Sequence, residues 1–330
     1  MKLLFVFTGG TIGSTLSGDC ISVEKGKPYK IIKLYSEKFG LDVPYDIIEP
    51  YTELSENNSG NTLRRLVSSV LENQGKGYDG IIVTHGTDTI QYSAAALAYA
   101  LGNSSIPVCI VSSNYPLEDK RANGLFNLHA AVKFITEQQK GGVWVAYKNP
   151  CEPVRIHRAT RLLSGQAFSC RLDSIFESCY GYYDSDFVFH QSIGFEEHPD
   201  EIPPLGIDSL ADTCGSILRI APYTGIEYPK LSDNIKYVLL ESYHSGTINT
   251  KSAEAERFFK EAAERRIEVF LTGASDEKAY ESTKAFGKFS ICPLKSCAPI
   301  AMYIKLWLAD SSGIEPKQIL RKSLSGDIVP

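Results

Sequence analysis

The sequence predicts an α/β protein with a mainly parallel, doubly wound sheet and a second, smaller α/β unit. Short apolar runs rich in Ile, Val and aromatic residues, such as 3–7, 80–84 and 107–112, alternate with segments whose apolar residues repeat at helical spacing. The alternation resumes after a proline-rich, acidic stretch at 196–213. A βαβα order implies right-handed crossovers and parallel strands.

Each element is expected from its own pattern. Strands are predicted at apolar runs that suit burial on both faces: 3–7, 46–49, 80–84, 107–112, 142–147, 215–221, 236–241 and 267–272. Helices are predicted where apolar residues recur three or four positions apart, at 63–71, 94–101 and 128–135. Two further helices are predicted in the second unit, at 251–265 between strands and at about 297–309. The expected domains are 1–195, with a linker at 196–213, and 214–330.

Composition narrows the classes of function. The chain has 330 residues, a formal net charge of −5 and no basic block longer than an Arg-Arg pair, so nucleic acid is not an expected partner. No apolar run approaches the ~18 residues of a membrane span. Eight cysteines are scattered singly without a secretion signal, which favours free thiols in the cytoplasm. Neither a metal-ligand motif nor a dinucleotide fingerprint is present, so we expect no metal and no cofactor.

Two threonine-bearing segments follow directly on predicted strands. Thr-Gly-Gly-Thr-Ile-Gly at 8–13 follows the run 3–7, and Thr-His-Gly-Thr-Asp-Thr at 84–89 follows Gly-Ile-Ile-Val at 80–83. The carboxyl ends of parallel strands are where ligands bind in such sheets. The glycines beside Thr11 permit a tight turn, so its hydroxyl is a candidate nucleophile.

Each segment also has a structural interpretation. Thr11 could cap the following helix, because threonine is a good N-cap residue. His85 is assigned to structure, since a lone histidine at a strand end usually makes a local hydrogen bond. Ser55 to Gly60 could be no more than the start of a helix.

Together the two segments resemble the bacterial-type L-asparaginase family of threonine amidohydrolases, which includes glutaminase-asparaginases and the D subunit of an archaeal tRNA-dependent amidotransferase. The likeness extends to 107–128, which includes Arg-Ala-Asn-Gly-Leu-Phe-Asn-Leu at 121–128, and to the second-domain strand end at 239–247. The amidotransferase interpretation is weaker, because the first motif begins at residue 8 and leaves no room for the extra N-terminal domain of such proteins.

The resemblance implies a threonine-nucleophile mechanism without a cofactor. Thr11 is expected to attack the side-chain amide carbon of L-asparagine or a similar small amide, to release ammonia, and to form an acyl-enzyme that water hydrolyses to L-aspartate. Thr87 and Asp88 are expected to activate the hydroxyl or the water, and the Asp88 carboxylate to hold the substrate's α-amino group.

Further residues are expected at the substrate by the same resemblance. Gly10 and Gly86 lie inside the two motifs, and Ser55 and Glu56 lie where the family has a substrate-binding serine followed by a polar residue. In related enzymes the second domain of a neighbouring protomer completes the site, so Ser245 is expected there and the protein is expected to be a homodimer or homotetramer.

This chain departs from the family pattern at two places. Counting to the family's loop tyrosine arrives at Ile21, and Tyr29 is the nearest phenol. The family's catalytic lysine falls at Ser164, and no lysine occurs from 149 to 229. Lys120 is the first candidate to replace the missing cation, although a solvated surface charge is the more ordinary interpretation of this lysine. Arg158 and Arg161 are the next candidates.

Two classes of function therefore stay open. The first is an asparaginase-like amidohydrolase with a modified second catalytic group. The second is an amino-acid or amide binder that keeps the fold and the pocket without efficient turnover.

Overall fold

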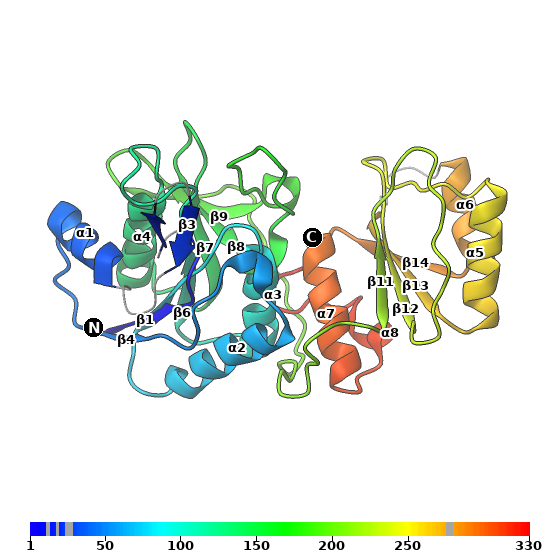
Figure 1. The fold of residues 1–330 in the computed structure, drawn as a ribbon, viewed down its shortest axis with the longest axis horizontal. Helices are drawn as coiled ribbons and strands as arrows, with labels where there is room; N and C mark the ends of the chain where they lie inside the picture. Colours follow the sequence, from blue (N-terminus) through cyan, green and yellow to red (C-terminus); the bar gives the residue numbers. More distant parts are fainter. Residues whose placement is uncertain (11–13, 18–19, 24–28, 275–279) are drawn as a thin grey trace.

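The computed structural model describes residues 1–10, 14–17, 20–23, 29–274 and 280–330, which form two lobes (Figure 1). The strands of the large lobe's eight-stranded sheet are, in spatial order, β10 (Phe189–Gln191), β9 (Cys179–Tyr183), β8 (Val154–Arg158), β7 (Gly142–Lys148), β6 (Pro107–Val111), β5 (Gly80–Thr84), β1 (Leu3–Phe7) and β4 (Tyr45–Ile48). Those of the small lobe are β11 (Ile217–Ile220), β12 (Tyr237–Glu241), β13 (Glu268–Ala274) and β14 (Ile291–Lys295). A separate hairpin pairs β2 (Ser14–Ser17) with β3 (Cys20–Val23).

The predicted fold class is confirmed. Neighbours from β4 through β1, β5, β6 and β7 are parallel, and the small sheet is parallel throughout. From β7 to β10 the neighbours are antiparallel. Only 149–153 separates β7 from β8, which is too short for a parallel crossover, so the chain must turn back.

The helices and sheets form a stack of layers. Helices α1 (Tyr29–Phe39) and α4 (Gly124–Lys133) pack on one face of the large sheet, and α2 (Gly60–Gln74) and α3 (Ile90–Leu101) pack on the other. Helix α7 (Pro299–Ser311) lies between α3 and the small sheet (Figure 1), and its apolar residues join the two lobes in one continuous core. The outer face of the small sheet is covered by α5 (Ala253–Glu264) and α6 (Glu281–Lys288), and a short α8 (Pro316–Ile319) follows α7.

Sequence patterns locate the buried strands well and the other elements less well. Each predicted strand and each predicted helix has a counterpart within a few residues. Strands β2, β3, β8, β9, β10 and β14 and helices α1, α6 and α8 are not predicted by these patterns. Strand β8, Val-Arg-Ile-His-Arg, alternates apolar and polar residues and lacks the continuous apolar run that identifies the central strands.

The proline-rich stretch at 196–213 contains no helix or strand, yet it is packed against both lobes' shared core. Leu205, Ile207 and Leu210 are buried. The Asp212 carboxylate accepts hydrogen bonds from the Asn61 amide, 2.8 Å, and the Ser59 hydroxyl, 2.6 Å, at the start of α2. The stretch is therefore an ordered connection; the exact domain boundaries stay a prediction.

A buried ion pair fastens the end of the chain to α3. The Lys305 ammonium on α7 lies 2.7 Å from the Asp327 carboxylate, and both side chains are fully buried. Tyr99 on α3 donates its hydroxyl to the same carboxylate at 2.9 Å, and the Leu324 amide donates to its other oxygen at 2.9 Å. A charge in this environment is stable only if its partners stay in place.

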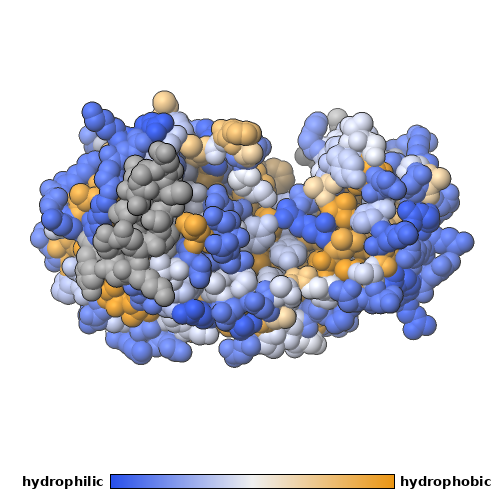
Figure 2. All heavy atoms as spheres, viewed as in Figure 1, coloured by the Kyte–Doolittle hydropathy of each residue, from blue (hydrophilic) through white to orange (hydrophobic). Residues whose placement is uncertain are grey.

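The described residues were also compared with what a membrane span, a metal cluster and a disulfide require. Within the described ranges no helix is long and apolar enough to cross a membrane, and no cluster of three His, Cys, Asp or Glu side chains could hold a metal. The described cysteines, seven in number, are free. On the face drawn in Figure 2, hydrophobic residues are visible where the two lobes meet.

We predict that Asp327→Asn lowers the free energy of unfolding by about 3–5 kcal/mol, because it leaves the Lys305 charge buried without a counter-ion. Urea denaturation followed by circular dichroism measures the change. The double variant Lys305→Met/Asp327→Asn should lose less than the single variant, since no charge is left behind.

The matched control is Lys288→Met, which removes one partner of an exposed ion pair with Glu256. It should cost no more than about 1 kcal/mol. If Asp327→Asn lowers the free energy of unfolding by no more than Lys288→Met does, the buried pair does not hold the tail.

Candidate active site

The two predicted motifs meet at the carboxyl edge of the large sheet. Gly10, which follows β1, has a φ of +77°, and a β-carbon built on it would lie 2.4 Å from the backbone nitrogen of Gly86. Only glycine permits this φ and this approach together. The Thr8 hydroxyl also donates to the Thr84 carbonyl at 2.7 Å, so the ends of β1 and β5 are held side by side.

Ser55 lies against the second motif from the other side. It opens a single 3₁₀ turn, Ser55–Asn57, and a β-carbon on Gly86 would lie 2.4 Å from the Ser55 hydroxyl oxygen. The Thr89 hydroxyl donates to the Ser55 carbonyl at 2.8 Å. Three segments that are distant in sequence, around Gly10, Ser55 and Gly86, therefore converge on one point.

His85 supports this point from the buried side. Its Nδ1 lies 2.8 Å from the Gly86 carbonyl oxygen, and its Nε2 lies 3.3 Å from the Asn58 amide nitrogen. Burial lowers the pKa of His85 to about 4, so the ring is neutral at physiological pH. The ring therefore makes the local hydrogen bond that was expected of it.

A hollow of about 360 Å³ opens beside these strand ends. Thr87 and Asp88 line it just before α3 begins at Ile90, where the helix N-terminus favours negative charge. Asn114 and Tyr147 line it from the strand ends of β6 and β7. Its remaining wall is a loop after β8 that contributes Gly165, Gln166, Ala167, Ser169, Cys170, Arg171 and Leu172.

Asparagine side chains tie the neighbouring strand ends together. Asn114 and Asn123 exchange hydrogen bonds, each side-chain oxygen accepting from the other's backbone amide, at 3.1 and 2.9 Å. Asn127 donates to the Ser112 carbonyl at 2.8 Å and accepts from the Lys148 amide at 2.8 Å. The segment 121–128, which carries part of the family resemblance, therefore fixes the spacing of β6 and β7 below the hollow.

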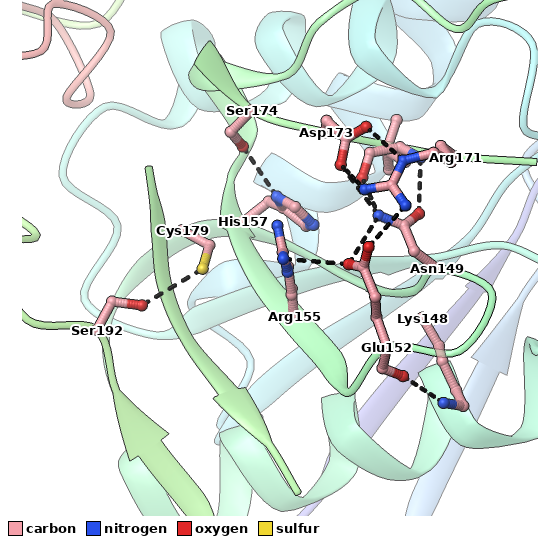
Figure 3. Close-up of polar contacts among 11 residues, drawn as sticks. Lys148, Asn149, Glu152, Arg155, His157, Arg171, Asp173, Ser174, Cys179 and Ser192 are labelled. Atoms are coloured by element: carbon pink, nitrogen blue, oxygen red, sulfur yellow. Dashed lines mark hydrogen bonds and ion pairs between the residues drawn. The ribbon is translucent and has the colours of Figure 1, made fainter. Parts of the chain in front are cut away.

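The loop over the hollow is held by a polar cluster (Figure 3). Asn149, just after β7, accepts from the Leu172 amide at 2.9 Å and donates to the Asp173 carboxylate at 3.0 Å. The Arg171 guanidinium bridges Asp173, at 3.0 and 3.1 Å, and Glu152, at 2.6 Å. We call Asn149, Glu152, Arg171 and Asp173 the loop clamp.

The hydrogen bonds of the loop clamp determine the protonation state of Arg171 in the wall of the hollow. Its hydrogen bonds to Asp173 and then to Glu152 raise the pKa of Arg171. The guanidinium therefore stays protonated, and its charge is matched by two carboxylates. Arg171 can orient a polar ligand but is poorly suited to transfer a proton.

His157, on β8, supports the end of the same loop. Its Nδ1 lies 2.8 Å from the Ser174 hydroxyl, directly after the clamp (Figure 3), and both side chains are buried. Burial lowers the pKa of His157 to about 4. The neutral ring fixes the end of the loop and is not among the residues that line the hollow.

The predicted site residues are placed as follows. Thr87 and Asp88 line the hollow, and Gly10, Ser55 and Gly86 form the contact behind it. Glu56 is exposed and is not among the lining residues. Thr11 lies outside the described residues, directly after Gly10.

Lys120 and Ser245 are not among the residues that line the hollow with Thr87 and Asp88. Lys120 is exposed and lines an adjacent hollow of about 390 Å³, which shares Asn114 and Cys170 with the first. Ser245 lies in the small lobe beyond β12, where its hydroxyl is 3.1 Å from that of Thr247. The roles of both residues stay predictions.

Arg158 and Arg161, the other candidate cations, are buried away from the site. Arg158 pairs with Glu197 at 2.7 Å, and Arg161 donates to the Gly326 carbonyl at 2.8 Å and to the Glu196 carbonyl at 2.6 Å. These partners belong to the chain after β10 and to the C-terminal tail. Neither guanidinium is hydrogen-bonded to Thr87 or Asp88.

Sequence reasoning missed the loop clamp and the lining residues Asn114 and Tyr147. Asn149 could have been found, because it follows β7 directly, at the edge of the sheet where ligands bind. Arg171 and Asp173 gave no signal, since their partner Glu152 lies about twenty positions earlier, before β8.

Comparisons with known proteins indicate the family of this chain. The sequence model described as "Asparaginase, N-terminal" matches residues 2–177. The L-asparaginase of Thermococcus kodakarensis is 26% identical over 342 residues, which cover 99% of each chain. The D subunit of the glutamyl-tRNA(Gln) amidotransferase of Pyrobaculum aerophilum is 29% identical over 163 residues, which cover 49% of this chain and 39% of that protein.

A solved structure shares the whole fold. The crystal structure of L-asparaginase I from Vibrio cholerae superimposes with a TM-score of 0.76 at 20% identity, over 100% of this chain and 99% of the other. The resemblance inferred from the two motifs is confirmed. The chain belongs to the asparaginase family.

Proposed function

We propose that this protein hydrolyses the side-chain amide of L-asparagine, or of a similar small amide, to the acid and ammonia. The observation that carries the proposal is the backbone contact between Gly10 and Gly86, which brings the residue before Thr11 to the residue before Thr87 and Asp88. The family supports amide hydrolysis in general. The choice of asparagine is our proposal.

The reaction divides into two steps. The Thr11 hydroxyl oxygen attacks the amide carbon, its proton passes to the departing nitrogen, and ammonia leaves an ester between Thr11 and the acyl group. Water then attacks the ester carbon and returns the proton to Thr11. Thr87 and Asp88, in the wall of the hollow, are proposed to position the water, and the exposed Asp88 carboxylate to hold the substrate's ammonium.

One observation favours the alternative of a binder with little turnover. Among the described lining residues of the hollow, the only cation is Arg171, and its charge is already matched by Asp173 and Glu152. An ammonia-release assay with asparagine and glutamine, run beside a thermal-shift assay, separates the two functions. A binder would be stabilised by the amino acid without releasing ammonia.

We further propose that a second copy of the chain covers the mouth of the hollow. Phe168 lies between the lining residues Ala167 and Ser169 and is completely exposed, at 111%. Leu163 in the same loop and Phe176 just beyond it are also exposed, at 36% and 72%. Burying such side chains is favourable by about 25 cal/mol per Å². A homodimer or a dimer of dimers fits this surface, and we propose the cytoplasm as its location because the cysteines are scattered singly.

We predict that Thr11→Ala lowers ammonia release more than about a thousandfold, because the nucleophile is lost. The thermal midpoint should change little. Thr283→Ala, which removes a hydroxyl from α6 in the small lobe, serves as the control and should keep full activity. Activity of Thr11→Ala within about tenfold of the wild type would remove Thr11 from the mechanism.

Lys120→Met tests whether Lys120 supplies the missing positive field. We expect turnover to fall at least about a hundredfold, the scale of an electrostatic or acid–base group. Arg121→Met is the matched control, because Arg121 is the neighbouring exposed cation and is already paired with Asp119. Equal, small effects of both substitutions would make Lys120 a surface charge and strengthen the binder alternative.

Phe168→Ser should shift the protein toward the monomer and reduce activity together, because the second copy then fails to close the site. Light scattering after size-exclusion chromatography, at several concentrations, gives the oligomeric state. Leu71→Ser, which changes a side chain 41% exposed on α2, should leave both quantities unchanged. A fully active monomer would contradict the shared site.

A further inference from the structure

A second hollow, of about 560 Å³, lies at the amino edge of the large sheet, at the opposite end of the strands from Thr87 and Asp88. Its wall comes from the turns before β6 and β7, the end of β8 and the chain around β9 and β10. The residues that line it are Asn103, Ser104, Ser105, Lys140, Gly141, Gly142, Arg158, Tyr180, Gln191, Phe195, Glu197 and Pro199. None of them belongs to the candidate active site.

The Arg158 guanidinium in this hollow is buried but only partly satisfied. The side chain is 5% exposed. Its Nε donates to the Ser325 carbonyl at 2.9 Å and lies 2.7 Å from the Glu197 carboxylate. Nη1 reaches the Val143 carbonyl only at 3.5 Å, and no residue in the described part of the chain accepts a hydrogen bond from Nη2. A guanidinium has five N–H donors, and Nη2, which is not among the fully buried side-chain atoms without a partner, is open to the hollow.

The unsatisfied side of Arg158 is held in a fixed position. The guanidinium stacks on the Trp144 ring, 4.7 Å from its centroid. Gly142, with a φ of +105°, leaves the space in which Nη1 lies, because a β-carbon there would be 2.3 Å away. A planar pair of Nη donors fixed in this way matches the two oxygens of a carboxylate.

The charges and the walls of the hollow indicate which kind of carboxylate ligand would fit it. Arg158 and Lys140 contribute two positive charges and Glu197 one negative charge, which leaves a net charge of 2 − 1 = +1 for a single anion. Tyr180 and Phe195 pack edge to face, with centroids 5.3 Å apart, and give the hollow an apolar wall. A monocarboxylate would neutralise this net charge, whereas a doubly charged phosphate would leave the hollow with a net negative charge of 1 − 2 = −1.

We propose that this hollow is a binding site for a small organic monocarboxylate. The carboxylate accepts hydrogen bonds from the two Nη groups of Arg158, the Lys140 ammonium lies at the rim, and the apolar part of the ligand packs on Tyr180 and Phe195. The site is separate from the proposed amide hydrolysis and does not depend on it.

The test uses 4-fluorobenzoate as the probe and observes its ¹⁹F signal in a titration with the full-length protein. We expect saturable binding with a Kd near or below about 1 mM, which corresponds to about −4 kcal/mol. The neutral 4-fluorobenzamide should not bind, and inorganic phosphate should not displace the probe. Displacement by phosphate at equal concentration would overturn the assignment of a carboxylate.

One substitution at the rim of the hollow, with a matched control elsewhere, tests where the probe binds. Lys140→Glu reverses an exposed charge at the rim and should weaken binding at least about tenfold. Lys230→Glu makes the same change on an exposed lysine of the small lobe and should leave the Kd unchanged. Unchanged binding in Lys140→Glu would mean that the probe sits elsewhere, and the proposal would fail.

Arg158→Lys keeps the charge but removes the paired donors. It should abolish binding while circular dichroism shows a folded protein. Retained binding in a folded Arg158→Lys protein would contradict the proposal. If this variant does not fold, because Arg158 also holds the tail through Ser325, the Lys140→Glu comparison decides the question alone.

Discussion

The position of the two lobes relative to one another depends on the buried ion pair between Lys305 and Asp327. Lys305 on α7 is fully buried, and its ammonium is matched by Asp327 from the tail, which Tyr99 on α3 also holds. Because an unpaired charge in the core would cost several kcal/mol, α7 cannot slide along α3 without a large penalty. The Ser325 hydroxyl donates to the Ala98 carbonyl at 2.7 Å and extends the same joint along α3. The tail thus acts as part of the large lobe's core.

The same joint also engages two arginines of the large lobe, Arg158 and Arg161. Arg158, Thr160 and Arg161 donate to the carbonyls of Ser325 and Gly326 at 2.8 to 2.9 Å. The two arginines at the end of β8 and just after it therefore anchor the tail and, in the case of Arg158, face the second hollow. Under the proposed mechanism, a further cation beside Thr87 and Asp88 would come from another segment, and Lys120 is the candidate that we propose to test.

The candidate active site follows from the geometry of parallel strands. Strands β1, β5, β6 and β7 end at the same edge, so the segments after them meet without long loops. Gly10 and Gly86 allow the first two segments to touch, and the loop clamp adds a wall from residues after β8. The charged part of the clamp faces partly outward, whereas Asn149 holds the backbone of Leu172 in the interior.

The sequence by itself determined the fold class, the central strands and the two threonine motifs. Continuous apolar runs require burial on both faces, and glycines beside a threonine at a strand end serve a tight turn, so these features are local. The contact of Ser55 with Gly86, the Arg171 bridge between Glu152 and Asp173, and the use of Arg158 and Arg161 at the tail were decided only by the tertiary structure. A charged side chain is equally compatible with solvent and with a buried partner, and the Ser325 carbonyl that Arg158 reaches lies 167 positions away along the chain. Local patterns carry no information about such distances, because chain topology alone brings these residues together.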